Sequence, residues 1–236
     1  MNMVLLEEEE LEAQLPHDDP RIKHITGILG LSEGGCFLAG IVGGAKGEAV
    51  LHRESSRGWR IQFTPKEPSP PLLPVTIIIG APRPPVAKRL LRDLTAMGVR
   101  EMRFCAAELS EKSYLSAKLW REGQWLIALK NGAMQGGSTF LPRVRTMNSL
   151  REALSGLPEN AARIGFDMTG EKSSRGEKDW AEMGLALGPE RGWTDSERRV
   201  LRENGFTIRS LGERILRTET ACAAALGLLL GERGIY

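Results

Sequence analysis

Cysteine is scarce in this chain of 236 residues, and its three copies form no recognisable pattern. Cys36, Cys105 and Cys222 are far apart and odd in number, which argues against a disulfide framework and against a Cys-x-x-Cys metal site. Sparse cysteine is typical of a reducing compartment, so we expect a cytoplasmic protein.

Histidine is equally rare, with three residues that all precede residue 53. The rest of the chain therefore cannot assemble a histidine-ligated metal site or a histidine-based catalytic triad. We expect a functional site without a metal.

Long apolar runs are also missing. The longest, residues 221–230, is about half of the roughly 20 residues that a membrane-spanning helix needs. The first residues lack the basic start and apolar centre of a signal peptide, and the glutamates at positions 7–10 oppose one. We expect no targeting segment and no membrane partner.

The usual glycine-rich phosphate loops are absent as well. No G-x-G-x-x-G follows an expected strand and no G-x-x-x-x-G-K-[ST] occurs, so Rossmann and P-loop functions lose their main support. The segment GGAKGE has a lysine among glycines, but no helix follows it, and we expect a hairpin turn there. The formal charge of +2 neither requires nor excludes a nucleic-acid partner.

What the chain does contain is a clear change of pattern around a proline-rich segment. PKEPSPPLLP has five prolines, which favour an extended and semi-rigid chain, so residues 67–74 are expected to be a linker. Before it, residues 1–66 carry short apolar segments and glycine turns typical of a small β-rich domain, with a helix around DPRIKHITGIL. After it, strands and helices alternate, including a long helical stretch over 113–135, so residues 75–236 are predicted to be an α/β domain with a largely parallel sheet.

Two glycine loops in the last third of the chain form the best candidate site. LALGPERGWTDSE is a strand followed by a loop, with a capping box of Thr194 and Glu197 that opens the next helix. FTIRSLG leads into a second loop, LGERILRTETA, and another helix. Such loops lie at the carboxyl edge of a parallel sheet, where ligands bind, and an apolar wall with approachable backbone suits a flat heterocycle. Ordinary turn glycines and core leucines fit the same spacing equally well.

The segments LGPERGWTDSE and SLGERILRTETACAAAL resemble the C-terminal signature of the SPOUT methyltransferases, in particular the ribosomal RNA small subunit methyltransferase E family. DPRIKHITGILGLSEGGCFLAG is similar to that family's PUA-like barrel. The resemblance implies a PUA-like β-barrel domain followed by a SPOUT α/β domain with a trefoil knot. It also implies S-adenosylmethionine as cofactor, N3 of a uridine in small-subunit ribosomal RNA or the small ribosomal subunit as substrate, and a homodimer.

The residues expected to bind the cofactor are Leu187, Gly188, Pro189, Glu190, Gly192, Leu211, Gly212, Ile215, Leu216 and Thr220. Small residues of the last helix, residues 221–227, suit burial at a dimer interface, although burial within one monomer also explains them.

Methylation at uridine N3 requires loss of a proton and leaves charge on the two neighbouring carbonyl oxygens. Arg217 and Glu219 are residue types that suit this chemistry. Arg217 is a cation that can hold a phosphate or the uridine carbonyls, and Glu219 is a carboxylate that can orient a donor or take a proton. We expect these two to be catalytic. Alternatively, Thr218 or Thr220 only caps the last helix, Glu219 only complements its dipole, and Glu190 only supports its loop.

Several positions depart from the family pattern. Arg191 stands where the family has glycine, beside the expected cofactor site, and Gly30, Leu109 and Ser138 stand where arginines are expected. Because phosphate contacts supply much of the affinity for nucleic acids, these changes bear on how RNA is held. They leave open a divergent paralogue that methylates another RNA, and a non-catalytic RNA- or ribosome-binding protein.

Overall fold

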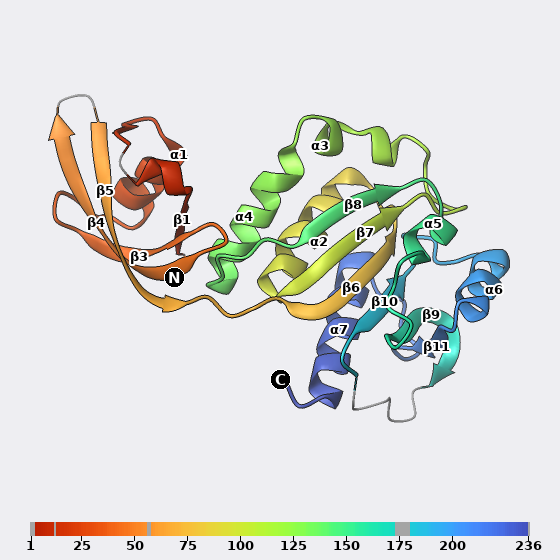
Figure 1. The fold of residues 1–236 in the computed structure, drawn as a ribbon. Helices are drawn as coiled ribbons and strands as arrows, with labels where there is room; N and C mark the ends of the chain where they lie inside the picture. Colours follow the sequence, from red (N-terminus) through yellow and green to blue (C-terminus); the bar gives the residue numbers. More distant parts are fainter. Residues whose placement is uncertain (1–2, 12, 56–57, 173–179, 236) are drawn as a thin grey trace. The chain divides into compact units, whose positions relative to one another are not determined.

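The computed structural model describes residues 3–11, 13–55, 58–172 and 180–235. The chain divides into two compact units, residues 1–71 with 133–141 and residues 72–132 with 142–236 (Figure 1). The strands β5 (Gly58–Pro68) and β6 (Leu73–Gly80) each extend into the segment that was expected to be a linker, and residues 69–72 between them are neither strand nor helix. The second segment of the first unit begins inside helix α4 (Gln124–Gly136), which no local pattern had indicated.

The first unit contains a five-stranded sheet in the order β1-β3-β4-β5-β2. Besides β5 it comprises β1 (Val4–Leu6), β2 (Leu15–Pro16), β3 (Cys36–Ile41) and β4 (Ala45–Ser55). β1 runs parallel to β3, and the other pairs are antiparallel. The turn between β3 and β4 includes Gly43 at φ +73°, so GGAKGE begins in a hairpin turn as predicted.

The predicted helix of the first unit is present but short. Asp19 accepts a hydrogen bond from the backbone N–H of Arg21, and Pro20 occupies the first turn, where its missing N–H costs nothing. Helix α1 (Pro20–Lys23) continues into a π-helical turn (His24–Ile28). Ile22 and Ile25 are buried there in the same apolar core as the strand residues Leu51 and Ile61. A 3₁₀ turn (Glu8–Glu10) follows β1.

The second unit is built on a six-stranded sheet in which all neighbouring strands are parallel, as the sequence predicted. Its order is β11-β9-β10-β6-β7-β8. Besides β6 the strands are β7 (Val99–Cys105), β8 (Arg143–Met147), β9 (Ala162–Lys172), β10 (Met183–Leu187) and β11 (Thr207–Ser210). β10 is thus inserted between two strands that precede it in the sequence.

Helices cover both faces of this sheet, which explains the unbroken apolar run of β6. Ile78 belongs to a core cluster with residues of α5 (Leu150–Leu154) and α6 (Asp195–Glu203). Ile77 and Ile79 are also fully buried, and by the alternation of side chains along a strand they lie on the opposite face. There α2 (Pro84–Ala96) packs on β7 and on α7 (Thr218–Glu232), and α7 packs on β10.

The prediction of one long helix over residues 113–135 is wrong. The segment contains a 3₁₀ turn (Tyr114–Ser116), α3 (Lys118–Arg121) and the start of α4. Gly123 lies between α3 and α4 with φ +69°, a left-handed conformation that interrupts the helix. Within the described ranges, no helix is both long enough and apolar enough to cross a membrane.

Candidate functional site

A cavity of about 370 Å³ opens in the second unit where three segments meet. One of them is the part of β9 that continues beyond its pairing with β10, which ends where Phe166 lies opposite Leu187, and the second is the loop after β10. The third connects β11 to α7. The cavity lies at the carboxyl edge of a parallel sheet, where open α/β folds place their ligands, and its size falls within the range of small-molecule sites. Its lining comprises residues 166–169, 187–193, Arg198, Leu211, Arg214, Ile215, Leu216, Thr218 and Ala221.

Most residues expected to bind the cofactor are brought together here. Those that line the cavity are Leu187, Gly188, Pro189, Glu190, Gly192, Leu211, Ile215 and Leu216. Gly212 and Thr220 do not belong to the lining, although their neighbours Leu211 and Ala221 do. Ile215 is 87% exposed, so it forms part of an open rim instead of a buried wall.

The loop after β10 is folded tightly on itself. A Cβ atom at Gly188 would lie 2.8 Å from the Cα and carbonyl carbon of Gly192 and 3.0 Å from the nitrogen of Trp193. The N–H of Gly192 donates to the carbonyl of Pro189 at 2.9 Å, and Gly192 adopts φ +72°. Glycine is therefore needed at position 188 for space and at position 192 for conformation.

Glu190 connects this loop to the start of α2. Its Oε1 accepts a hydrogen bond of 2.9 Å from the backbone N–H of Arg83, the residue that precedes the helix. Close packing of Gly80 reinforces the contact, since a Cβ there would lie 2.4 Å from Cδ of Pro189. The loop-supporting alternative for Glu190 thus has a structural basis.

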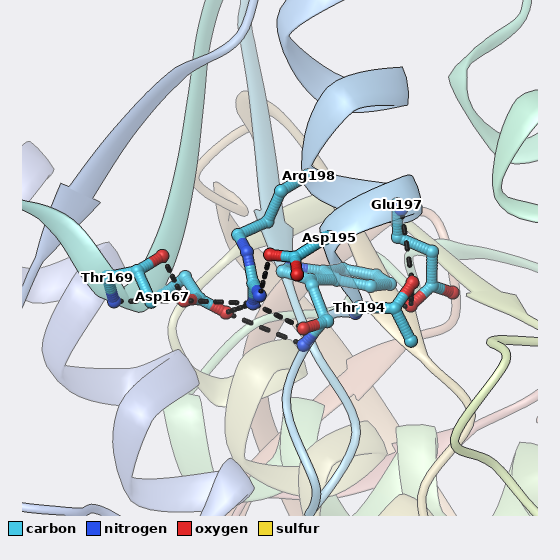
Figure 2. A network of polar contacts seen from close by, with 7 residues as sticks. Asp167, Thr169, Thr194, Asp195, Glu197 and Arg198 are labelled. Atoms are coloured by element: carbon cyan, nitrogen blue, oxygen red, sulfur yellow. Dashed lines mark hydrogen bonds and ion pairs between the residues drawn. The ribbon is translucent and has the colours of Figure 1, made fainter.

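Asp167 and Arg198 form a polar network beside the loop (Figure 2). Oδ1 of Asp167 accepts hydrogen bonds from the N–H of Thr169 at 2.9 Å and from its hydroxyl at 2.7 Å. Nη1 of Arg198 lies 3.3 Å from both carboxylate oxygens of Asp167. The Asp167 side chain is 6% exposed and that of Arg198 16%, so the charges pair largely away from water.

Helix α6 begins as the sequence predicted. The N–H of Glu197 donates to the Thr194 hydroxyl at 3.1 Å, and the Glu197 carboxylate accepts from the Thr194 N–H at 2.9 Å. The same buried carboxylate accepts from the N–H of Glu108 at 2.9 Å, which ties the loop after β7 to this helix. The capping box therefore fixes two loops at the sheet edge.

The expected catalytic pair lies at the start of α7 and outside the cavity lining. Arg217 precedes the first turn and is exposed. Oε1 of Glu219 accepts from Nη2 of Arg89 on α2 at 2.8 Å and from its Nε at 3.2 Å. The N–H of Glu219 itself and then the Arg89 guanidinium hold the pKa of this carboxyl below its ordinary value. Glu219 is consequently an anion at neutral pH with reduced basicity.

Two cations line the rim of the cavity. Arg191 and Arg214 are both exposed, and neither forms an ion pair with any residue that the structure describes. Arg191, the position at which the sequence resemblance indicated a departure from the family pattern, therefore lies at the solvent-exposed edge of the cavity.

The described ranges contain no group of three or more His, Cys, Asp or Glu side chains able to hold a metal ion. Burial raises the pKa of the Cys105 thiol to about 12, which keeps it protonated at neutral pH.

Asp167 and Arg198 were missed by the sequence analysis. One signal was available for Asp167, a charged residue directly after the segment ARIGF, at the point where β9 ceases to pair with β10. Its pairing with a residue 31 positions away depends on strand order, which the local pattern does not contain.

Comparisons with known proteins agree on one family. Residues 68–230 match the model of an RNA methyltransferase domain. The chain is 35% identical to ribosomal RNA small subunit methyltransferase E of Treponema pallidum, over 98% of this chain and 91% of that protein. It is 30% identical to ribosomal RNA small subunit methyltransferase E 1 of Borreliella burgdorferi, over 95% of each. The crystal structure of ribosomal RNA small subunit methyltransferase E from Neisseria gonorrhoeae bound to S-adenosyl methionine superposes with a TM-score of 0.76 at 23% identity, covering 98% of this chain and 97% of that one.

Proposed function

The chain belongs to the ribosomal RNA small subunit methyltransferase E family, and we propose from this membership and from the cavity that it methylates N3 of a uridine. As a family member it is an S-adenosylmethionine-dependent methyltransferase of small-subunit ribosomal RNA. The observation that supports cofactor binding is the cavity at the carboxyl edge of the sheet, since it combines the size, the apolar wall and the close backbone that the cofactor requires.

The residues present fit S-adenosylmethionine. Leu187, Leu211 and Leu216 offer an apolar wall for the adenine ring, and the glycine loop after β10 brings its backbone to the edge of the cavity. Gly188 and Gly192 allow this loop its close turn, and Pro189, Glu190 and Ile215 complete it. Gly212, at φ +113°, shapes the second loop from outside the lining, and Thr220 follows in the first turn of α7.

When bound, S-adenosylmethionine supplies an electrophilic methyl group on a sulfonium. The protein has to exclude water and align the base nitrogen with that group. When the N3 proton is released to solvent, negative charge remains on the uridine oxygens O2 and O4, and a nearby cation stabilises it.

Arg217 and Glu219 are the residues to which we assign this chemistry. Arg217 is exposed at the start of α7, where it can hold a phosphate or a uridine carbonyl. Glu219 orients a donor, because its carboxylate already binds the Arg89 guanidinium at 2.8 Å. Its lowered pKa makes the alternative role of proton acceptor less suitable.

The trefoil knot and the PUA-like barrel are part of the proposal. Insertion of β10 between β9 and β6, together with packing of α7 on α2 and β10, supports a knotted SPOUT arrangement. The mostly antiparallel strands and closed apolar core of the first unit support a PUA-like RNA-binding role.

A homodimer is also proposed, through α7. One side of this helix is buried in its own unit by Cys222, Leu226 and Leu229. Ala224, Leu228 and Gly231 are exposed and recur at intervals of four and three residues, which places them on a common stripe. Such an unpaired apolar stripe suits a second copy of the chain.

The decisive experiment incubates the purified protein with S-adenosylmethionine and unmodified small ribosomal subunits, and then identifies methylated nucleosides by mass spectrometry. The expected product is 3-methyluridine at a single site, absent with heat-inactivated protein. A different methylated nucleoside would contradict the uridine N3 assignment and favour a divergent paralogue.

A further inference from the structure

Residues 188–193, between β10 and the N-cap of helix α6, are called here the cofactor loop, and Trp193 is its last residue. Its indole is buried in the apolar cluster beneath α5 and α6, with 2% of the residue exposed. Its backbone continues the turn that begins at Gly188 and passes through Gly192. The two peptide groups that flank Trp193 are thus continuous with the loop that lines the cavity.

Both backbone polar groups of Trp193 are held by one ion pair. Its N–H donates to Oδ2 of Asp167 at 3.5 Å, and its carbonyl accepts a hydrogen bond from Nη1 of Arg198. Because Nη1 of Arg198 also contacts both oxygens of Asp167, the three groups form a closed ring. We call this ring of Asp167, Arg198 and the Trp193 backbone the loop clamp.

The two clamp side chains are themselves fixed in place. Thr169 donates two hydrogen bonds to Oδ1 of Asp167, which leaves Oδ2 directed towards Trp193. Nη2 of Arg198 donates to Oδ1 of Asp195 at 2.7 Å, and the Asp195 carboxylate raises the pKa of Arg198. Asp195 is 95% exposed, so this outer contact is separable from the inner pair.

We infer that Asp167 and Arg198 are positioning residues, which hold the loop over 188–193 in the shape that binds the cofactor. This role rests on the proposed function of the cavity. Neither residue is assigned to the methyl transfer itself. Charge-assisted hydrogen bonds are stronger than neutral ones, and here they act on the two peptide groups that flank Trp193, so loss of either partner frees the loop. Pre-organisation of this kind strengthens binding by reducing the ordering cost.

The test compares Asp167→Asn with Asp195→Asn in the full-length chain. Asp167→Asn removes the negative charge, and its amide NH₂ group has to face one of the donors that bind Asp167 in the wild type. Asp195→Asn alters only the outer contact of Arg198. We expect Asp167→Asn to weaken S-adenosylmethionine binding at least tenfold in calorimetry, with kcat at saturating cofactor changed less than twofold. For Asp195→Asn, the cofactor affinity and kcat should both stay within twofold of the wild-type values. Equal effects of the two variants, or unchanged affinity in folded Asp167→Asn, would overturn the clamp.

Arg198→Lys provides a second route if Asp167→Asn does not fold. Lysine keeps the positive charge beside Asp167 but cannot bridge the carboxylate and the Trp193 carbonyl in the same way. We again expect a loss of at least tenfold in cofactor affinity. The double variant should bind no more weakly than the poorer single variant, since both changes break one ring. If the fold-losses in cofactor affinity of the two single variants instead multiplied in the double variant, the two residues would act separately, which would refute the clamp.

Amide hydrogen exchange separates this inference from the proposed function. Without any ligand, the Trp193 N–H should exchange at least tenfold faster in Asp167→Asn than in wild type, and within twofold of wild type in Asp195→Asn. If wild type bound no S-adenosylmethionine, the proposed function would fail, while this exchange difference would still support the loop clamp. Equal Trp193 exchange in all three proteins would refute it.

Discussion

Replacement of Gly188 by alanine tests whether the cofactor loop depends on close backbone packing. The added Cβ would meet two carbons of Gly192 at 2.8 Å, well inside ordinary van der Waals contact, and the nitrogen of Trp193 at 3.0 Å. All three are backbone atoms, so no flexible side chain can move aside. The loop itself has to shift.

The expected cost follows from two opposing effects. Overpacking of this kind costs about 1–3 kcal/mol. Alanine also restricts the unfolded chain, which returns about 0.4–1 kcal/mol because Gly188 does not need a positive φ. We expect a net loss of about 1–2 kcal/mol in stability, or about 2–8 °C in Tm for a chain of this size. A shift of the cavity wall should also weaken S-adenosylmethionine binding at least tenfold, about 1.4 kcal/mol.

Differential scanning fluorimetry and calorimetric titration measure the two effects. Gly27→Ala is the matched control, because a Cβ there meets no atom within 4 Å and the residue does not line the cavity. This control should bind the cofactor as wild type does. A Gly188→Ala protein with wild-type Tm and affinity within twofold of wild type would refute the packing argument.

Four further predictions concern other parts of the second unit. Glu232→Ala removes the charge facing the buried Arg209 guanidinium, with which it pairs at 2.6 Å, and should lower the free energy of unfolding by about 3 kcal/mol in denaturant titrations. Folding lowers the pKa of Glu219, so its negative charge stabilises the protein above pH 4.5, and this stabilisation is lost as the pH falls through the folded pKa. In thermal melts, Glu219→Gln should therefore be less stable than wild type at neutral pH and equally stable at low pH. Arg191→Gly should raise the KM for RNA and reduce the slope of log RNA affinity against log salt concentration by about 1. The affinity for the cofactor should stay within twofold of wild type; tighter cofactor binding would instead mean that Arg191 obstructs the cavity. Leu228→Lys should convert a dimer into a monomer in light-scattering chromatography, and an unchanged mass would contradict the α7 interface.

The elements around the cavity were predictable because their signals are local. The apolar run before Gly188 predicted β10, and the spacing of Thr194 and Glu197 predicted the start of α6, whose hydrogen bonds confirm it. Thr218 opens α7 at the edge of the expected Ala/Leu helix. Each of these features depends on residues within a few positions of one another.

Features that depend on distant residues were not predictable. The grouping of residues 133–141 with the first unit joins segments more than 60 positions apart. The contact of Asp167 with Arg198 requires knowledge that β9 lies next to β10. Gly123 shows a different limit: apolar periodicity continues past it, and only its positive φ reveals that the helix is interrupted.

The position of β10 in the sheet has a consequence for synthesis of the chain. β6 and β9 are made before β10, so β6 keeps one unpaired edge until residues 183–187 have left the ribosome, while β9 keeps two, because its other neighbour β11 is made later still. Unpaired edges of apolar strands are prone to join with other chains. Completion of the sheet also waits for a pairing between β6 and β10 that spans more than 100 residues, and such distant contacts form slowly. The nascent protein therefore passes through a stage in which the centre of its final sheet is open, and chaperones that cover strand edges should act most strongly before β10 is in place.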